Sequence, residues 1–449
     1  MKKIFQYIML AVVTIVMASC TSDIEETTAT TGKNNVQLVV GEFPAFGDSQ
    51  TRAIGTPDEG KTSWAEGDEL LLEIDNTSYG RHNATFTYNG KSWELTSGEL
   101  VYLEGDPAYI SHVYYAPNYK WSNTSLMLKK GKVAGTDELI EGKARITGNG
   151  ETITVSFAEA TRKYSRLRIA TLPNEQITVD TEYFTPAGSS DMEQNGNYTL
   201  TSDEKGNAYL YGTFENNSEV TVKYREAALT TYTFSQATES AKSYALDATV
   251  ISANSAEEIK SAIEQKVADG KTTIRLNLAP NAGTNEFMAI REAIKGAAPN
   301  DLGTIELTII GVETIPEEAF YKMLQLKSVR MSDVKEIKKY AFKECQYLTV
   351  VEAPSLNKLC SGAFKKCDQL AKLTFGPINY ADARNWPIFE YITPNIDLIL
   401  SDYQKEMIET DSYLYTANND RDYAGSDEHN SKNFLGREFR SITCRYKVK

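Results

Sequence analysis

Between about residue 36 and residue 250, short runs of alternating apolar and polar residues are separated by clusters of Gly, Asn, Asp and Pro. This alternation predicts strands with one buried and one solvated face. The runs are Val36–Val40, Leu70–Ile74, Ala84–Tyr88, His112–Tyr115, Ile153–Phe157, Ala208–Tyr211 and Val220–Tyr224. Asn89-Gly90 is a hairpin signal. Since helical periodicity is almost absent, we expect antiparallel β-sandwiches over 36–250, in two subdomains that divide near residues 150–165.

Residues 251–306 show a different pattern, in which helical and strand periods alternate. Ser255 and Glu258 form a capping box before an apolar stripe, and Gly270 marks the end of that helix. A strand over Thr273–Leu278, a second helix from Asn285 to Lys295 that stops at Gly296, and a strand over Thr304–Ile309 follow. We expect this α/β unit to begin a solenoid, because its faces need a neighbour to cover them.

Residues 307–376 repeat with a period of 22. The period joins Ala319-Phe320, Ala341-Phe342 and Ala363-Phe364, and likewise Met323, Cys345 and Cys367, and Leu326, Leu348 and Leu370. Several independent positions share it, which indicates a repeat array. We expect each coil to be one short strand plus a turn of helix. The A-F-x-x-C-x-x-L pattern closely resembles BspA-like leucine-rich repeats of bacterial surface proteins, and the resemblance implies an α/β leucine-rich repeat solenoid.

The outward strand positions of this array are the candidate binding face. One row contains Glu306, Ser328, Val350 and Lys372, and a second contains Thr308, Arg330, Glu352 and Thr374. Their mixed charge and few aromatic residues favour a protein partner over a sugar, with a plain solvated sheet face as the alternative. Residues 377–449 are expected to cap the array. Their Asp-rich loop around Asp420 and Asp422 lacks the regular calcium pattern and is interpreted as solvated.

Composition argues against several classes of function. The 61 acidic residues exceed the 47 basic ones, for a net charge of −14, which leaves no electrostatic footprint for nucleic acid. The three histidines, His82, His112 and His429, lie in different segments. No H-E-x-x-H, P-loop or G-x-S-x-G motif occurs. We therefore expect no enzyme, cofactor or metal, although a pair of glycosidase carboxylates that meets only in the fold stays open.

The N-terminus has the pattern of a secretory signal. Lys2 and Lys3 precede the apolar run Ile4–Met17, and small residues precede Cys20. The segment resembles a bacterial lipoprotein signal, which implies removal of 1–19, diacylation of Cys20 and anchoring at the outer membrane of a Gram-negative bacterium, exposed at the cell surface. A plain secreted protein with an incidental cysteine is the alternative. Residues 20–35 are polar and predict a flexible tether.

Residues 36–250 also resemble the fimbrillin, or Mfa-like, family of pilin and adhesin proteins. The resemblance rests on Thr51-Arg52-Ala53, on Trp64 with Gly67-Asp68, and on Val113–Pro117. It implies two transthyretin-like sandwiches in tandem. In polymerising members a protease cuts after an arginine, a role that Arg52, followed by Ala53, would have here. The alternative, which we favour because the region continues directly into the repeats, is an ordinary loop arginine.

The cysteines other than Cys20 are interpreted separately. Cys345 and Cys367 are expected to fill a small buried slot, whereas a Cys360–Cys444 bridge stays open. The leading functional hypothesis is a non-catalytic, surface-anchored lipoprotein for cell adhesion or protein–protein interaction, with the solenoid as binding module. The alternatives are a fimbrial anchor or accessory subunit, whose partners would be other fimbrial subunits joined by strand exchange, and a glycan-capture lipoprotein.

Overall fold

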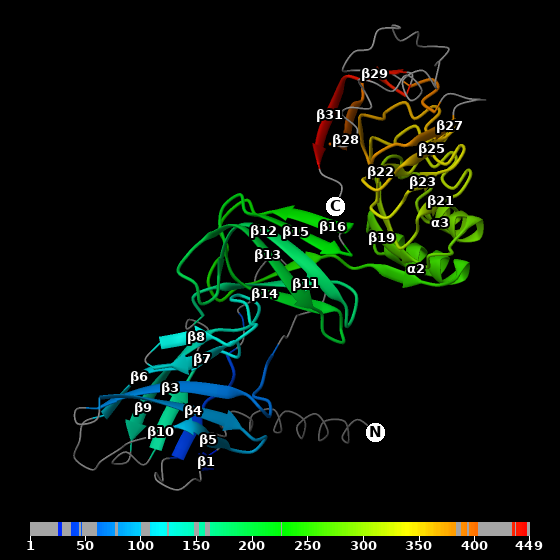
Figure 1. Cartoon of the computed structure of the whole chain (residues 1–449). Helices are drawn as coiled ribbons and strands as arrows, with labels where there is room; N and C mark the ends of the chain where they lie inside the picture. Colours follow the sequence, from blue (N-terminus) through cyan, green and yellow to red (C-terminus); the bar gives the residue numbers. More distant parts are fainter. Residues whose placement is uncertain are drawn as a thin grey trace, which may run out of the picture.

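The computed structural model of the chain describes residues 26–28, 37–44, 46, 61–76, 80–99, 108–123, 125–147, 152–157, 162–225, 227–382, 388–392, 395–402, 433–435 and 437–446. In this part the chain is mostly β, with two helices. Two β-rich bodies are followed by a stacked array of parallel strands, and the array lies at the end remote from β1 (Figure 1).

The first body is one eight-stranded sheet that folds over on itself as a sandwich. Its strands, in the order in which they pair, are β1 (Glu26–Thr28), β2 (Gln37–Val40), β10 (Thr152–Ser156), β9 (Ile140–Thr147), β6 (Ala108–Tyr115), β3 (Glu69–Asn76), β4 (Gly80–Tyr88) and β5 (Trp93–Gly98). A hairpin of β7 (Tyr119–Ser122) and β8 (Ser125–Leu128) is added. Leu38 of β2 and Phe86 of β4, far apart in this order, share one core. The predicted Asn89-Gly90 hairpin is confirmed between β4 and β5.

The segment predicted as a flexible tether contains a strand. β1 pairs antiparallel with β2, so that Glu26 lies opposite Val39. Main-chain hydrogen bonds to an open strand edge require no apolar pattern, which is why the sequence did not indicate this strand. The signal segment, Cys20, Arg52 and Ala53 lie outside the described residues.

The second body is a seven-stranded sheet with its own core. Its strands are β11 (Ser165–Ala170), β12 (Gln176–Pro186), β13 (Glu193–Thr201), β14 (Asn207–Phe214), β15 (Glu219–Tyr224), β16 (Ala227–Thr233) and β17 (Ser243–Asp247). They pair in the order β16-β15-β12-β14-β11-β17, with β13 added to β12. Residues from all seven strands meet in one apolar cluster, in which the Phe184 and Phe214 rings lie 4.5 Å apart.

A buried polar network joins the two sandwiches. Arg162, just before β11, is 1% exposed and donates from Nη2 to Glu138 Oε1 over 3.1 Å, and from Nη1 to the carbonyl of Pro44 over 2.7 Å. Tyr164 donates its hydroxyl to Glu138 Oε2 at 2.6 Å. Burial and the Glu138 carboxylate raise the pKa of Tyr164 well above its usual value. The two buried charges of this network, on Arg162 and Glu138, are therefore paired with each other, which offsets the cost of burying them.

The array is a parallel sheet in chain order. It contains β18 (Ile251–Ala253), β19 (Thr273–Leu278), β20 (Ile305–Ile310), β22 (Leu326–Met331), β24 (Val350–Ala353), β26 (Lys372–Phe375), β28 (Asp397–Ser401) and β31 (Ser441–Tyr446). A second, four-stranded parallel sheet contains β21 (Thr314–Ile315), β23 (Glu336–Ile337), β25 (Lys358–Cys360) and β27 (Tyr380–Asp382). The short β29 (Asn433–Phe434) and β30 (Arg437–Glu438) form a hairpin. The stack therefore continues beyond residue 376, through β28 and β31.

Helices α2 (Ala256–Ala268) and α3 (Thr284–Ala297) cover the first coils. The predicted N-cap is confirmed, since Ser255 Oγ accepts from the Glu258 amide at 3.3 Å, and Gly270 follows α2 at φ +73°. The predicted stop at Gly296 is wrong, because α3 continues through it to Ala297. A glycine within a helix costs only about 1 kcal/mol, and the buried Phe287 and Ile294 of this helix outweigh that cost.

The coil turns are not the turns of helix that we expected. Some of their amide groups bond to the next coil: the Phe320 amide donates to the Ala341 carbonyl and the Phe342 amide to the Ala363 carbonyl, both at 2.8 Å. Others close tight turns within their own coil, as the Met323 amide does with the Phe320 carbonyl at 3.1 Å. Left-handed residues recur in these turns at the same period, at Glu318, Tyr340 and Gly362, and at Lys322, Glu344 and Lys366. Inside the turns, the rings of Phe320, Phe342 and Phe364 stack at 5.1 and 5.3 Å.

The cysteines of the array are thiols. Cys345 and Cys367 are fully buried, as predicted for the small slot, and their Sγ atoms donate to the carbonyls of Phe320 and Phe342 at 2.9 and 3.0 Å. No disulfide joins Cys360 to Cys444, or any other two cysteines, in the part of the chain that the structure describes.

Candidate ligand-binding surface of the repeat array

The two outward rows of the array align as the period of 22 predicts. Parallel pairing places Glu306, Ser328, Val350 and Lys372 side by side, and Thr308, Arg330, Glu352 and Thr374 beside them. Between these rows, Leu307, Val329, Val351 and Leu373 point into the core and are buried. The strands therefore present a regular outer face on a rigid sheet.

Ion pairs cross this face from coil to coil. Lys327 Nζ lies 2.8 Å from Glu306 Oε1, and Arg330 Nε lies 3.0 Å from Glu352 Oε2. All four side chains are substantially exposed. Exposed pairs contribute less than about 1 kcal/mol each, so an approaching surface can replace one partner at small cost.

The second sandwich covers the beginning of this face. Thr308 is only 4% exposed, and Ile310, two residues further on the same side of β20, packs into the core of the second sandwich. Thr308 is therefore not available to a ligand, in contrast to the expectation from the outward row. In the row of Thr308, the open part of the face begins at Arg330 of β22, whereas Glu306 of the first row stays exposed.

Arg275 of β19 forms the boundary of the covered part. Its Nε donates to the carbonyl of Leu229 in β16 over 2.6 Å, and its guanidinium lies 3.9 Å from Asp247. Burial lowers the pKa of Arg275, and Asp247 opposes that shift. The sequence analysis did not identify Arg275. Its signal was the row of Thr308 and Arg330, because Arg275 occupies the position in this row one strand before Thr308.

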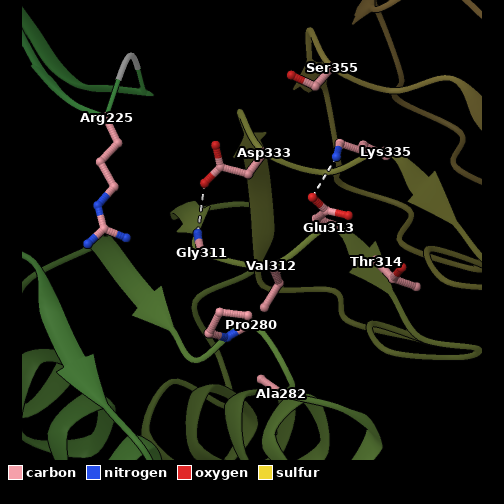
Figure 2. Close-up of a pocket in the computed structure, with 10 residues that line it drawn as sticks. All are labelled: Arg225, Pro280, Ala282, Gly311, Val312, Glu313, Thr314, Asp333, Lys335 and Ser355. Atoms are coloured by element: carbon pink, nitrogen blue, oxygen red, sulfur yellow. Dashed lines mark hydrogen bonds and ion pairs between the residues drawn. The ribbon is translucent and has the colours of Figure 1, made fainter.

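A pocket of about 720 Å³ with polar and apolar lining residues adjoins this junction (Figure 2). The loops that follow β19, β20, β22 and β24 form most of its wall, and the β15–β16 turn of the second sandwich contributes Arg225. The Gly311 amide donates to Asp333 Oδ2 at 2.8 Å, and Lys335 Nζ lies 2.5 Å from Glu313 Oε1. The lining residues are Arg225, Pro280, Ala282, Gly311, Val312, Glu313, Thr314, Asp333, Lys335 and Ser355.

The pocket is suited to a polar group. The Arg225 guanidinium lies 4.9 Å from the Tyr224 ring centre and has no carboxylate partner within the described residues. Figure 2 shows it across the pocket from Asp333, with the hydroxyls of Thr314 and Ser355 further along the wall. Pockets between two modules are common ligand sites, and this one offers both charge signs.

The other predicted residues do not converge on a site. His82 of β4 pairs with Ile74 of β3, and His112 of β6 pairs with Glu73 of β3. Since Ile74 and Glu73 are adjacent along β3, the two histidines project from opposite faces of the sheet. His429, Asp420 and Asp422 lie outside the described residues. In the described ranges, no three His, Cys, Asp or Glu side chains are grouped to hold a metal ion. The helices of those ranges are also too short or too polar to cross a membrane.

In the comparison with known proteins, one family matches part of the chain. Residues 301–407 match the BspA type leucine rich repeat region, in six copies. No curated protein matches the chain. A solved candidate cell adhesion protein from Bacteroides fragilis aligns at 11% identity and a TM-score of 0.29, over 48% of this chain and 93% of its own. The minor pilin GBS52 from Streptococcus agalactiae aligns at 8% identity and a TM-score of 0.17, over 48% of this chain and 94% of its own.

Proposed function

We propose that the chain is a non-catalytic protein of the bacterial surface, which is held in the outer membrane of a Gram-negative bacterium by lipid on Cys20. In this proposal the repeat array binds a partner protein in cell adhesion. The observation that carries it is the open strand face that begins at Arg330, built from repeats of a type matched at 301–407. Solenoids characteristically bind partners along such regular surfaces.

The face has the composition of a protein-binding patch. Val350 is apolar at its centre, while Arg330, Glu352 and Lys372 surround it with both charge signs. Interfaces commonly combine an apolar centre with a polar rim that fixes orientation. The adjoining pocket, with Arg225 and Asp333, would take a polar side chain of the same partner.

An adherence assay tests this function. Beads coated with the chain from residue 21 onward are added to cultured epithelial cells and to immobilised matrix proteins. We expect adherence of the unaltered chain and at least a tenfold loss for Arg330→Glu, which places two acids side by side. The exchanged pair R330E/E352R keeps the ion pair but reverses its direction, so it should also lose adherence. Lys120→Glu, an equal charge change on the exposed face of β7, is the control.

Adherence by R330E/E352R equal to that of the unaltered chain would remove the strand face from the proposal. Intact mass and the N-terminal residue of protein extracted from its native membrane test the anchor separately. A lipidated Cys20 as first residue supports it, and an unmodified terminus rejects it.

A fimbrial subunit is the second candidate, and the place of β2 favours it. β2 precedes Arg52 in the chain, pairs in parallel with β10, and contributes the buried Leu38 and Val40 to the first core. A cut between Arg52 and Ala53 would separate this strand from the body and leave a groove for the strand of a neighbouring subunit. The resemblance of 36–250 to fimbrillins and their transthyretin-like sandwiches supports this candidate.

The second candidate has its own test. An arginine-specific protease is applied to the purified chain, and oligomers that resist detergent are sought. Their appearance in the unaltered chain but not in Arg52→Ala would favour strand exchange. A cleaved chain that stays monomeric at high concentration would reject it.

A further inference from the structure

A stripe of basic side chains follows the turns of the repeat array. We define the basic stripe as Arg291, Lys295, Lys322, Lys343, Lys365 and Lys366. Helix α3 supplies the first two, and three successive coils supply the others. Arg291 Nη1 donates to the Glu318 carbonyl at 2.9 Å, and Lys295 Nζ lies 3.4 Å from the Tyr321 carbonyl, so the helix and the first coil are in contact.

Inter-coil hydrogen bonds continue the basic stripe. The Lys322 amide donates to the Lys343 carbonyl at 2.9 Å, and the Glu344 amide donates to the Lys365 carbonyl at 2.8 Å. Equivalent positions of neighbouring coils are about 4.8 Å apart. Lys343 and Lys365 share one such position, whereas Lys322 and Lys366 share another with Glu344 between them.

Tyrosine rings hold these lysines along the surface. Lys343 Nζ lies 5.0 Å from the ring centre of Tyr321 and 4.7 Å from that of Tyr340. Lys365 and Lys366 lie 5.3 and 5.8 Å from the ring centre of Tyr391. Cation–π contacts attract an ammonium group without neutralising it, so it can still bind an anion. They also restrict the side chain in advance, which lowers the entropic cost of binding.

Carboxylates neutralise only part of the basic stripe. Glu344 is 3.7 Å from Lys322 Nζ and 3.9 Å from Lys343 Nζ, and the buried Glu390 is 2.6 Å from Lys365 Nζ. Lys366 has no carboxylate partner among the described residues, and Glu317, Glu318 and Asp368 of the same turns pair with none of the six. Burial is the main cause of the lowered pKa of Lys295, and the neighbouring charges of Arg291 and Lys322 lower it further.

The arrangement points to a long, thin polyanion. The whole chain carries a net charge of −14, so a positive stripe on it attracts an acidic ligand against the general field. The coil spacing of about 4.8 Å is close to the length of one pyranose residue in an extended polysaccharide. An acidic group on each sugar residue would therefore meet successive coils, and one on every second residue would meet alternate coils.

We propose that the basic stripe binds a linear anionic polysaccharide through its sulfate or carboxylate groups. The ligand lies across the coils, with one acidic group near Lys322 and Lys343 and the next near Lys365 and Lys366. The site lies on the turns and shares no residue with the strand face. Polysaccharide binding at the basic stripe is therefore independent of protein binding at the strand face.

Binding to defined polymers tests the site. Fluorescence anisotropy of the purified chain from residue 21 onward is measured against labelled heparin, polygalacturonate, neutral dextran and polyglutamate. We expect binding to heparin or polygalacturonate that weakens with added salt, and none to dextran. Heparin alone identifies sulfate as the ligand group, and polygalacturonate alone identifies carboxylate.

Two matched variants locate the binding. K343Q/K365Q/K366Q removes three charges from the basic stripe and should weaken binding at least tenfold. K130Q/K132Q/K143Q removes three exposed charges from the first sandwich and should leave binding unchanged. Tyr391→Ala changes no charge at a 49% exposed ring, and should weaken binding about threefold by releasing Lys365 and Lys366. R330E should bind as the unaltered chain does.

Three results would overturn the proposal. They are no binding to either acidic polysaccharide, an equal loss in the two triple variants, and tighter binding to polyglutamate than to both polysaccharides. The last result would assign the basic stripe to an acidic polypeptide instead. Circular dichroism and thermal unfolding of each variant exclude a loss that comes from misfolding.

Discussion

Arg275 of the array and Leu229 of the second sandwich are joined by a 2.6 Å hydrogen bond from the guanidinium Nε to the main-chain carbonyl. The two residues are 46 positions apart, and both are buried. This contact belongs to the surface that covers Thr308, and it closes one end of the strand face. The sandwich and the array are therefore packed together through a charged group with a fixed acceptor.

Replacing Arg275 should loosen this junction. Arg275→Gln loses the charged hydrogen bond to Leu229 and should lower the free energy of unfolding by about 2 kcal/mol. Urea unfolding followed by circular dichroism measures the loss, and limited proteolysis should cut the link between β17 and β18 faster. Arg330→Gln, at an exposed arginine two strands further on in the same row, should change stability by less than about 0.5 kcal/mol. Equal effects of the two variants would contradict the structural role of Arg275.

The junction between the two sandwiches should be more sensitive. Arg162→Met leaves the Glu138 carboxylate buried without its cation, and breaking such a pair costs about 3–5 kcal/mol. The double variant R162M/E138Q removes the stranded charge and should recover part of the loss. Tryptophan fluorescence during urea unfolding measures the stability of the first sandwich in each variant, since Trp64, Trp93 and Trp121 all lie there. A double variant no more stable than Arg162→Met would show that the ion pair is not the cause.

The buried thiols should be protected until the array unfolds. Burial raises the pKa of Cys345 to about 12 and raises that of Cys367 well above its usual value. Only the thiolate reacts with iodoacetamide, so neither cysteine should be alkylated at pH 8 in the folded chain. The half-buried Cys360 and Cys444 should react first. Mass spectrometry after labelling, with and without urea, tests this order, and prompt labelling of Cys345 without urea would contradict it.

The last strand of the array should loosen in acid. Hydrogen bonds from Arg440, and then from Ser441, lower the pKa of the Asp397 carboxyl from 3.8 to about 2. A carboxyl whose folded pKa is depressed contributes stability above its unfolded value, and this stability is lost as pH falls through the folded value. Amide exchange of β31, corrected for its intrinsic rate, should therefore accelerate between pH 4 and pH 2. Asp397→Asn should exchange faster already at pH 7 and show no such acceleration.

The stacking of the array could be predicted from the sequence, because residues of the same type recur at equivalent positions of each repeat. A period of 22 predicted that Glu306 and Ser328 would be neighbours, and the strands pair in that register. The turns were misread for a related reason. Residues such as Glu318 and Tyr340 favour no left-handed turn, and only Gly362 at the same position gives a signal. Hydrogen bonds to the next coil, which the sequence does not display, decide their conformation.

The junctions were not predictable from one sequence. Arg162, Arg225 and Arg275 belong to patterns typical of solvated positions, and their roles arise from segments distant in the chain. Thr308 shows the consequence, since the period places it correctly in a row but cannot show that another module covers that row. The basic stripe was missed because its members come from helix α3 and from turns that were expected to be helical.

The column of stacked phenylalanines gives each coil the same upper and lower surface. Phe342 meets Phe320 on one side and Phe364 on the other, at nearly equal spacing. A duplication of one period in the gene would insert a coil that fits both neighbours and would lengthen the array by about 4.8 Å. The sandwiches, the helices and the final strands would need no change. Recombination can thus adjust the reach of this protein in small, equal increments.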